Sequence, residues 1–153
     1  MSAPSADAVF VAVDPGDRHT GVAWFEQDAT QPGGWKCRSW SILTPEQVYE
    51  TLMPDIQREQ PAVVVLERWQ LYPQAAGSQI GKDMLASQLI GALSWQAYRF
   101  GIPVEVQQAA VKVPVRARLR QMGIKLTAPS KPDHARDAEI HGWAYLIRKG
   151  LTT

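Results

Sequence analysis

Short apolar runs that end on turn residues recur along the chain, and such runs are typical of buried β-strands. The first covers residues 9–13 and ends on Asp14, which begins an Asp-Pro-Gly turn. A second run at residues 21–25 follows at hairpin spacing, and apolar and polar residues alternate from 35 to 43. These three segments predict an antiparallel meander at the start of the chain.

Two later runs complete the predicted sheet. Residues 61–66 (PAVVVL) are expected to form a buried fourth strand that ends on Glu67, and residues 104–106 a short fifth strand. After the third strand, Thr44 and Gln47 have the spacing of a capping box, which predicts the start of a helix.

Helical patterns fill much of the remaining chain. Residues 77–100 predict a long helix that is apolar on more than one side, as in a central helix or one shared with a second subunit. Residues 113–122 predict a basic helix. The last helix is expected to open at Ser130, with Asp133 as its capping-box partner. The order of elements predicts an α/β protein.

Length and composition indicate one domain. With 153 residues, of which 45% are hydrophobic, the chain is large enough to bury a core without disulfides. Cys37 is its single cysteine, which excludes an internal disulfide and a multi-cysteine zinc site. Residues 1–7 are expected to be disordered, and residues 8–153 to form the domain. Neither a signal-peptide pattern nor an apolar run of ~20 residues is found, which predicts a cytoplasmic protein.

Basic residues concentrate in the last third of the chain. Residues 1–98 contain six Lys or Arg and eleven Asp or Glu, whereas residues 99–153 contain ten and four. Six basic residues follow one another without an intervening acid: Lys112, Arg116, Arg118, Arg120, Lys125 and Lys131. Such a block indicates a polyanionic partner, most commonly nucleic acid, or else a solvated helix face.

Candidate cation ligands stand where the predicted elements begin and end. Asp14 and Glu67 each close an apolar strand, where a charge is unfavourable unless it is paired or binds a cation. His134 and Asp137 lie one turn apart on the last helix and can share one cation. Simpler interpretations are a turn-opening aspartate, an ion pair between Glu67 and Arg68, and a hydrogen-bonded histidine.

The remaining histidine and aromatic residues indicate a function less specifically than the candidate cation ligands do. His141, further along the last helix, and His19, in the first turn, are assigned no role. Trp69 and Tyr72 follow the fourth strand, where they either cover the end of the sheet or stack on unpaired bases.

Four motifs occur in a fixed order over nearly the whole chain: Asp14-Pro15-Gly16 with Arg18, Thr20 and Gly21 (D-P-G-x-R-x-T-G), Val65-Leu66-Glu67, Val111-Lys112, and His134-Ala135-Arg136-Asp137-Ala138. Together they resemble the RuvC family of Holliday junction resolvases, including its shorter phage-type members. This resemblance implies a ribonuclease H-like fold, with a five-stranded mixed sheet whose first three strands are antiparallel, flanked by helices.

The resemblance also implies catalytic and metal-binding residues. Asp14 matches the first metal-binding aspartate of the family, and Glu67 matches its strand-four glutamate. Asp137 matches the last acid of its C-terminal helix, and His134 matches the position three residues before. Lys112 stands where the family has a DNA-contacting lysine.

The same resemblance implies further contacts with DNA. Arg116, Arg118 and Arg120 are expected phosphate partners. The family has an aromatic residue after the strand-four glutamate that opens the junction. Because Gln70 occupies the closest spacing here, Trp69 or Tyr72 would take that role.

The implied activity is that of a Mg²⁺-dependent endonuclease that resolves four-way DNA junctions in recombination and repair, leaving 5′-phosphate and 3′-hydroxyl ends. Two Mg²⁺ ions per active site are expected, with Mn²⁺ as a substitute. Asp14 would bridge the ions and Glu67 would hold the leaving-group side. Asp137 with His134 would serve the attacking water. Symmetric cleavage implies a homodimer, formed through the 77–100 helix; a phage-encoded protein would act in the bacterial host cytoplasm.

Three other functions fit parts of the pattern. A branch or flap endonuclease of the same fold would share the chemistry and select its substrate less strictly. A non-catalytic nucleic-acid-binding module would not need the acids, and their presence argues against it. An actin-like ATPase also begins with a strand-end aspartate and Thr-Gly, but it needs two duplicated domains, which 153 residues cannot hold.

Overall fold

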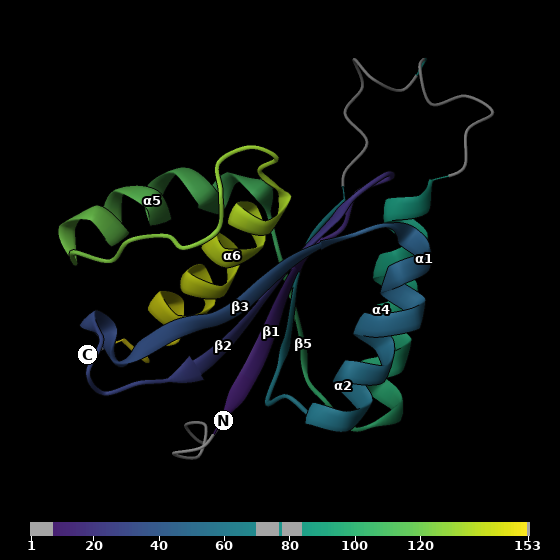
Figure 1. The fold of residues 1–153 in the computed structure, drawn as a ribbon, viewed down its shortest axis with the longest axis horizontal. Helices are drawn as coiled ribbons and strands as arrows, with labels where there is room; N and C mark the ends of the chain where they lie inside the picture. The colour runs from purple at the N-terminus through teal and green to yellow at the C-terminus, as the bar shows by residue number, and fades with distance from the viewer. Residues whose placement is uncertain (1–7, 70–76, 78–83, 153) are drawn as a thin grey trace.

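A single five-stranded sheet forms the centre of the protein (Figure 1). The computed structural model describes residues 8–69, 77 and 84–152. The strands are β1 (Val9–Asp14), β2 (Thr20–Gln27), β3 (Trp35–Leu43), β4 (Val64–Glu67) and β5 (Val104–Gln107). Their order is β3-β2-β1-β4-β5; the first three are antiparallel, whereas β4 runs parallel to β1 and β5 parallel to β4. The predicted mixed sheet with an antiparallel start is confirmed.

Helices cover both faces of this sheet (Figure 1). One face carries α5 (Lys112–Gln121) and α6 (His134–Arg148). The other carries α1 (Pro45–Gln47), a π-helical turn (Val48–Leu52), α2 (Met53–Glu59) and α4 (Leu85–Arg99). Short 3₁₀ turns, Pro32–Gly34 and Ala109–Val111, precede β3 and α5.

Both faces of β1 are buried. Phe10 and Ala12 pack in the core on the α6 side, and Val11 and Val13 pack in the core on the α4 side. Burial on both faces explains why this strand is a continuous apolar run and not an alternating one. Asp14, the last residue of β1, is therefore the first charged position on this strand.

The predicted 77–100 helix is not continuous in the part that the structure describes: Gly77 is helical, but the helix is broken at Met84. Met84 has non-helical backbone angles (φ −94°, ψ 69°), and α4 begins at Leu85. The Ala86 N–H in the first turn donates to Asp17 Oδ1 at 3.1 Å. A side chain from a distant loop thus satisfies a helix end that has no local cap.

The last helix also begins later than predicted. It starts at His134, and Asp133 is the N-cap residue without a side-chain capping bond, so the capping box from Ser130 is not formed. Pro132 explains the shorter helix, because a proline disfavours the helical conformation in the residue before it. In contrast, the Thr44–Gln47 capping box is confirmed in both directions, with hydrogen bonds of 2.9 and 3.3 Å.

No helix within the described residues combines the length and the apolar character that a membrane crossing requires.

Candidate active site

Three carboxylates converge at one edge of the sheet. Asp14 ends β1, Glu67 ends the neighbouring parallel strand β4, and Asp137 lies in the first turn of α6. One oxygen of each lies within 4.8 Å of an oxygen of the other two. Residues separated by 123 positions in the chain, from 14 to 137, are thus brought to one point, as the sequence predicts.

A glycine allows α6 to approach the sheet at this point. Gly21 is the cross-strand partner of Asp14 on β2, and a Cβ at this position would overlap the backbone carbonyl of His134. His134 Nδ1 lies 3.2 Å from Asp14 Oδ2. The glycine of the Thr-Gly pair therefore has a packing reason: it lets the helix that carries His134 and Asp137 lie against β2, next to Asp14.

Lys112 lies inside the acid cluster. Its ammonium donates to Glu67 Oε2 at 3.2 Å and to Asp137 Oδ2 at 2.7 Å, and Arg116 Nη2 donates to Asp137 Oδ1 at 3.2 Å. Burial alone would lower the pKa of Lys112, but the two carboxylates outweigh burial and raise it. Lys112 is therefore charged and compensates the acids.

His141, which sequence reasoning left without a role, supports Glu67. Its ring is fully buried, and Nε2 lies 2.7 Å from Glu67 Oε2. Nδ1 lies 2.7 Å from the side-chain amide of Gln107, the β5 residue paired with Glu67. The amide orientation that satisfies both Gln107 atoms has its nitrogen donating to Nδ1 and its oxygen accepting from Tyr145 N–H. In this arrangement, neutral His141 donates its Nε2–H to Glu67.

The pKa values of Asp14 and Glu67 are shifted in opposite directions. Burial, followed by the charges of Glu67 and Asp137, raises the pKa of Asp14 to about 8. Burial would also raise the pKa of Glu67, but hydrogen bonds from His141 and Lys112 reverse that effect and lower it. Asp14 is 8% exposed, and this burial disfavours its ionised form.

This donor set fits a divalent cation such as Mg²⁺. Hard cations prefer carboxylate oxygens, and the cluster offers three carboxylates close together. A cation would also favour the ionised form of Asp14, whose proton is otherwise retained near neutral pH. The ligands that would hold it are Asp14, Glu67 and Asp137, with His134 beside Asp14.

The raised pKa of Asp14 predicts how stability depends on pH when metal is chelated. Between its unfolded value of 3.8 and its folded value of about 8, the unfolded chain loses the Asp14 proton while the folded chain keeps it, so folding stability falls as pH rises. From pH 5.5 to 8 the expected loss is roughly 2–3 kcal/mol, at ~1.4 kcal/mol per pH unit. Urea unfolding in EDTA measures it, and Asp14→Asn is expected to remove the slope; an equal slope in both proteins would contradict it.

Among the described residues, no hydrogen bond or ion pair joins the remaining predicted site residues to the acids, and one of these residues lies outside the described part of the chain. Trp69 is half-buried two residues after β4, and Tyr72 lies outside the described residues. Arg118 and Arg120 are exposed on α5, and Arg118 contacts Gln121 at 3.4 Å. Their expected DNA contacts remain predictions.

The order and directions of the strands identify the fold. A mixed sheet of this order with flanking helices is the ribonuclease H-like fold that the motifs imply. No protein-family model matches the sequence, and no curated protein matches it significantly.

Solved structures of Holliday junction resolvases share this fold. RuvC from Thermus thermophilus, solved in complex with a Holliday junction substrate, aligns with a TM-score of 0.67 at 16% identity, over 95% of this chain and 98% of RuvC. The fowlpox virus resolvase aligns with a TM-score of 0.58 at 19% identity, over 92% and 98%. The yeast mitochondrial resolvase aligns with a TM-score of 0.59 at 11% identity, over 98% and 82%. The resemblance to RuvC is confirmed at the level of the fold.

Proposed function

We propose that this protein is a metal-dependent, structure-specific DNA endonuclease that resolves four-way junctions and leaves 5′-phosphate and 3′-hydroxyl ends. The observation that carries the proposal is the convergence of Asp14, Glu67 and Asp137 within 4.8 Å beside a basic helix. The match in fold to three resolvases over nearly their full length supports the choice of substrate.

The chain's own residues divide the work of phosphodiester hydrolysis. Asp14, Glu67 and Asp137 would hold Mg²⁺, which would supply a Lewis acid for the phosphate and a more acidic water. His134 lies next to Asp14, where its ring can orient the attacking water and accept its proton. Water adds to phosphorus, the bond to the 3′ oxygen breaks, and that oxygen takes up a proton.

Positive charges next to the acids favour binding of the substrate backbone. Lys112 and Arg116, which contact Glu67 and Asp137, can donate instead to phosphate oxygens. The same electrostatic attraction predicts that binding weakens steeply with salt.

Cleavage of labelled DNA tests the proposal. With Mg²⁺ or Mn²⁺, the protein is expected to cut a four-way junction at least ~10-fold faster than a flap or a linear duplex of the same sequence. Excess EDTA is expected to abolish cutting, because it removes the divalent cation from the three carboxylates. Product ends are read by ligation and by phosphatase sensitivity. Equal rates on flaps and junctions would establish a broader branch endonuclease, and binding without any metal-dependent cutting would establish a binding module.

A homodimer is part of the proposal, because two strands must be cut. Five exposed positions at the start of α4 and along it are spaced four and three residues apart: Met84, Gln88, Gly91, Trp95 and Tyr98. The rings of Trp95 and Tyr98, 61% and 75% exposed, stack on each other with centroids 5.7 Å apart. This spacing is that of a helix seam, and exposed aromatic pairs of this kind favour burial in an interface.

Light scattering tests this dimer. The protein is expected to have twice its chain mass of 17.0 kDa, and the double change Trp95→Glu with Tyr98→Glu is expected to give a folded monomer, because each dimer would bury four like charges. Tyr49→Glu, which changes an exposed aromatic residue on the helix after β3, is the matched control. A monomeric wild-type protein at micromolar concentration would contradict the dimer.

A further inference from the structure

A basic pocket lies between α5, the segment that follows it, and α6. Its volume is about 380 Å³. Four of its seven lining residues are cationic, namely Arg116, Arg120, Lys125 and Arg136, and the other three are aliphatic. Among the residues that the structure describes, no acidic side chain lines this pocket. A concave surface with this composition favours an anion over a neutral or cationic ligand.

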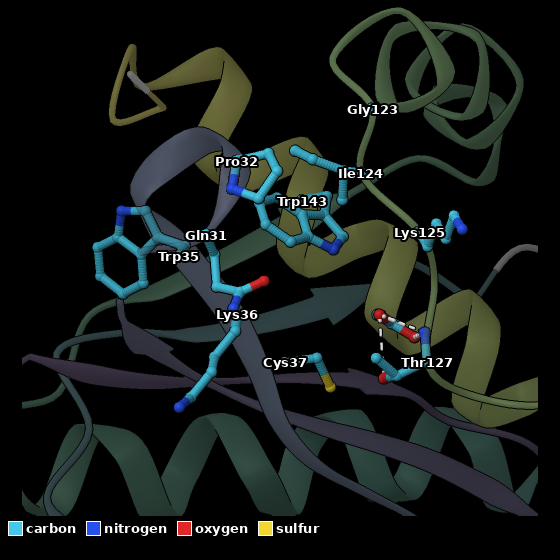
Figure 2. Close-up of a pocket in the computed structure, with 11 residues that line it drawn as sticks. Gln31, Pro32, Trp35, Lys36, Cys37, Gly123, Ile124, Lys125, Thr127 and Trp143 are labelled. Carbon is cyan, nitrogen blue, oxygen red and sulfur yellow. Dashed lines mark hydrogen bonds between the residues drawn. The ribbon is translucent and has the colours of Figure 1, made fainter. Parts of the chain in front are cut away.

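The wall of this pocket is anchored to α6. Glu139, buried in α6, accepts hydrogen bonds from Thr127 N–H at 2.9 Å and from Ala128 N–H at 2.8 Å. Figure 2 shows the bonds to Thr127 as dashed lines, with Lys125 on the same segment. Arg136 Nε also donates to Ala128 O at 3.1 Å. The segment that carries Lys125 is therefore held in place by buried hydrogen bonds and offers a preformed position for a ligand.

Figure 2 views the other side of this segment, where it faces β3. There Lys125 and Ile124 border a second cavity of about 330 Å³ that contains Trp35, Cys37 and Trp143. That cavity has aromatic walls and lies away from the three acids, toward the Trp35 end of β3. Two lysines and the buried Glu139 carboxylate line that cavity, whereas the basic pocket is lined by four cations without an acid among its described residues.

Arg116 connects the basic pocket to the acid cluster. It lines the pocket and donates to Asp137 Oδ1 at 3.2 Å. Arg120, one turn later on α5, lies on the same helix face. Arg118, two residues from Arg116, projects from the opposite side and is not part of the lining. A continuous row of cations thus leads from the acids into the pocket.

We propose that this pocket binds one backbone phosphate of the strand that is cut, adjacent to the phosphate at the acid cluster, with Arg120 and Lys125 as its contacts. The proposal rests on the proposed nuclease function and specifies how the protein positions the DNA strand that it cuts. A guanidinium donates two parallel N–H bonds to a phosphate, and an ammonium adds a point charge. Within the described parts of the chain, neither Arg120 nor Lys125 forms an ion pair or a side-chain hydrogen bond, so both can contact the DNA.

Junction binding by charge variants tests the pocket. In an Asp14→Asn background that prevents cutting, Arg120→Gln and Lys125→Gln are each expected to weaken binding of a fluorescent four-way junction by about 5–10-fold and to reduce the log–log salt slope by about 1. Arg148→Gln removes the same charge at the opposite end of α6, about 18 Å along the helix from Arg136 at 1.5 Å per residue. It is expected to weaken binding less than two-fold.

A methylphosphonate scan identifies the bound phosphate. Each linkage near the cut site is neutralised in turn, and binding is compared between the background protein and Arg120→Gln. Neutralisation of one linkage, or of two adjacent ones, is expected to weaken junction binding by the background protein about 5–10-fold. The same change is expected to have almost no effect on binding by Arg120→Gln, because that variant has already lost the contact. The pocket proposal would be wrong if the losses of binding affinity from neutralisation and from Arg120→Gln were additive at every linkage. It would also be wrong if Arg120→Gln and Arg148→Gln weakened binding equally.

These outcomes are separable from failure of the nuclease proposal. If the wild-type protein cuts junctions with Mg²⁺ and the pocket variants bind normally, the pocket proposal alone is wrong. If the wild-type protein cuts no DNA with any divalent cation, the nuclease proposal is wrong. Circular dichroism melting of each variant checks that Arg120→Gln and Lys125→Gln remain folded, as expected for exposed side chains.

Discussion

Replacing Asp14 with asparagine is expected to reduce the rate of junction cleavage by roughly 10³-fold or more, because the change removes a carboxylate that the other two acids cannot replace. Asp14 is central to the cluster: its oxygens lie near those of Glu67 and Asp137 and 3.2 Å from His134 Nδ1. Asparagine keeps the shape and a neutral oxygen. The measurement is single-turnover cleavage of a labelled four-way junction in Mg²⁺.

Binding provides the control for this loss. The affinity of Asp14→Asn for the uncut junction is expected to stay within about three-fold of the wild type, since one buried, proton-retaining carboxyl contributes little to DNA attraction at neutral pH. The variant is also expected to unfold at a higher urea concentration than the wild type at pH 8 in EDTA. Cleavage by the variant at the wild-type rate would show that the acids are not the active site.

Replacing His141 with leucine is expected to weaken Mn²⁺ binding and to slow cleavage, each by about 10–100-fold, as for residues that orient metal ligands. His141 lies at 2.7 Å from both Glu67 Oε2 and the Gln107 amide and is fully buried. Leucine leaves Lys112 as the remaining donor to Glu67 and removes the contact between the Gln107 amide and the imidazole. Mn²⁺ affinity is measured on the DNA-free protein by electron paramagnetic resonance.

Glutamine at position 141 separates this positioning role from packing. His141→Gln keeps a nitrogen donor near the place of Nε2, so its Mn²⁺ affinity is expected to lie within about five-fold of the wild type, while His141→Leu falls further. Both variants are compared by urea unfolding at the pH of the metal titration. If leucine and glutamine weaken stability alike and leave Mn²⁺ affinity unchanged, His141 only fills space.

The sheet and the position of its acids were predictable because burial restricts the residue types that a central strand can contain. β1 and β4 are buried, so their sequences are apolar until the residue that leaves the core, and that residue is Asp14 in one and Glu67 in the other. Parallel neighbours end at the same edge, which fixes where the two carboxylates meet. The helix that carries Asp137 was predicted from a capping box at Ser130, which is not formed, and the helix begins at His134.

Interactions between distant residues were not predictable in this way. His141 has the same helical spacing as many core histidines, and its function depends on Gln107, which a pattern within one helix does not reveal. The start of α4 depends on Asp17, a residue 69 positions earlier in the chain. The basic pocket depends on the Glu139 carboxylate, which anchors a segment without regular secondary structure.

The position of Lys112 means that the acid cluster contains its own counterion. Its ammonium contacts Glu67 and Asp137, which would otherwise repel each other, so the chain can complete folding before any divalent ion arrives. In the proposed metal site, an entering divalent cation would have to displace the Lys112 ammonium, and this exchange would lower the affinity for metal in the absence of nucleic acid. In the proposed nuclease, the displaced ammonium would be free to donate to a phosphate of the substrate, so metal loading and strand capture would reinforce each other.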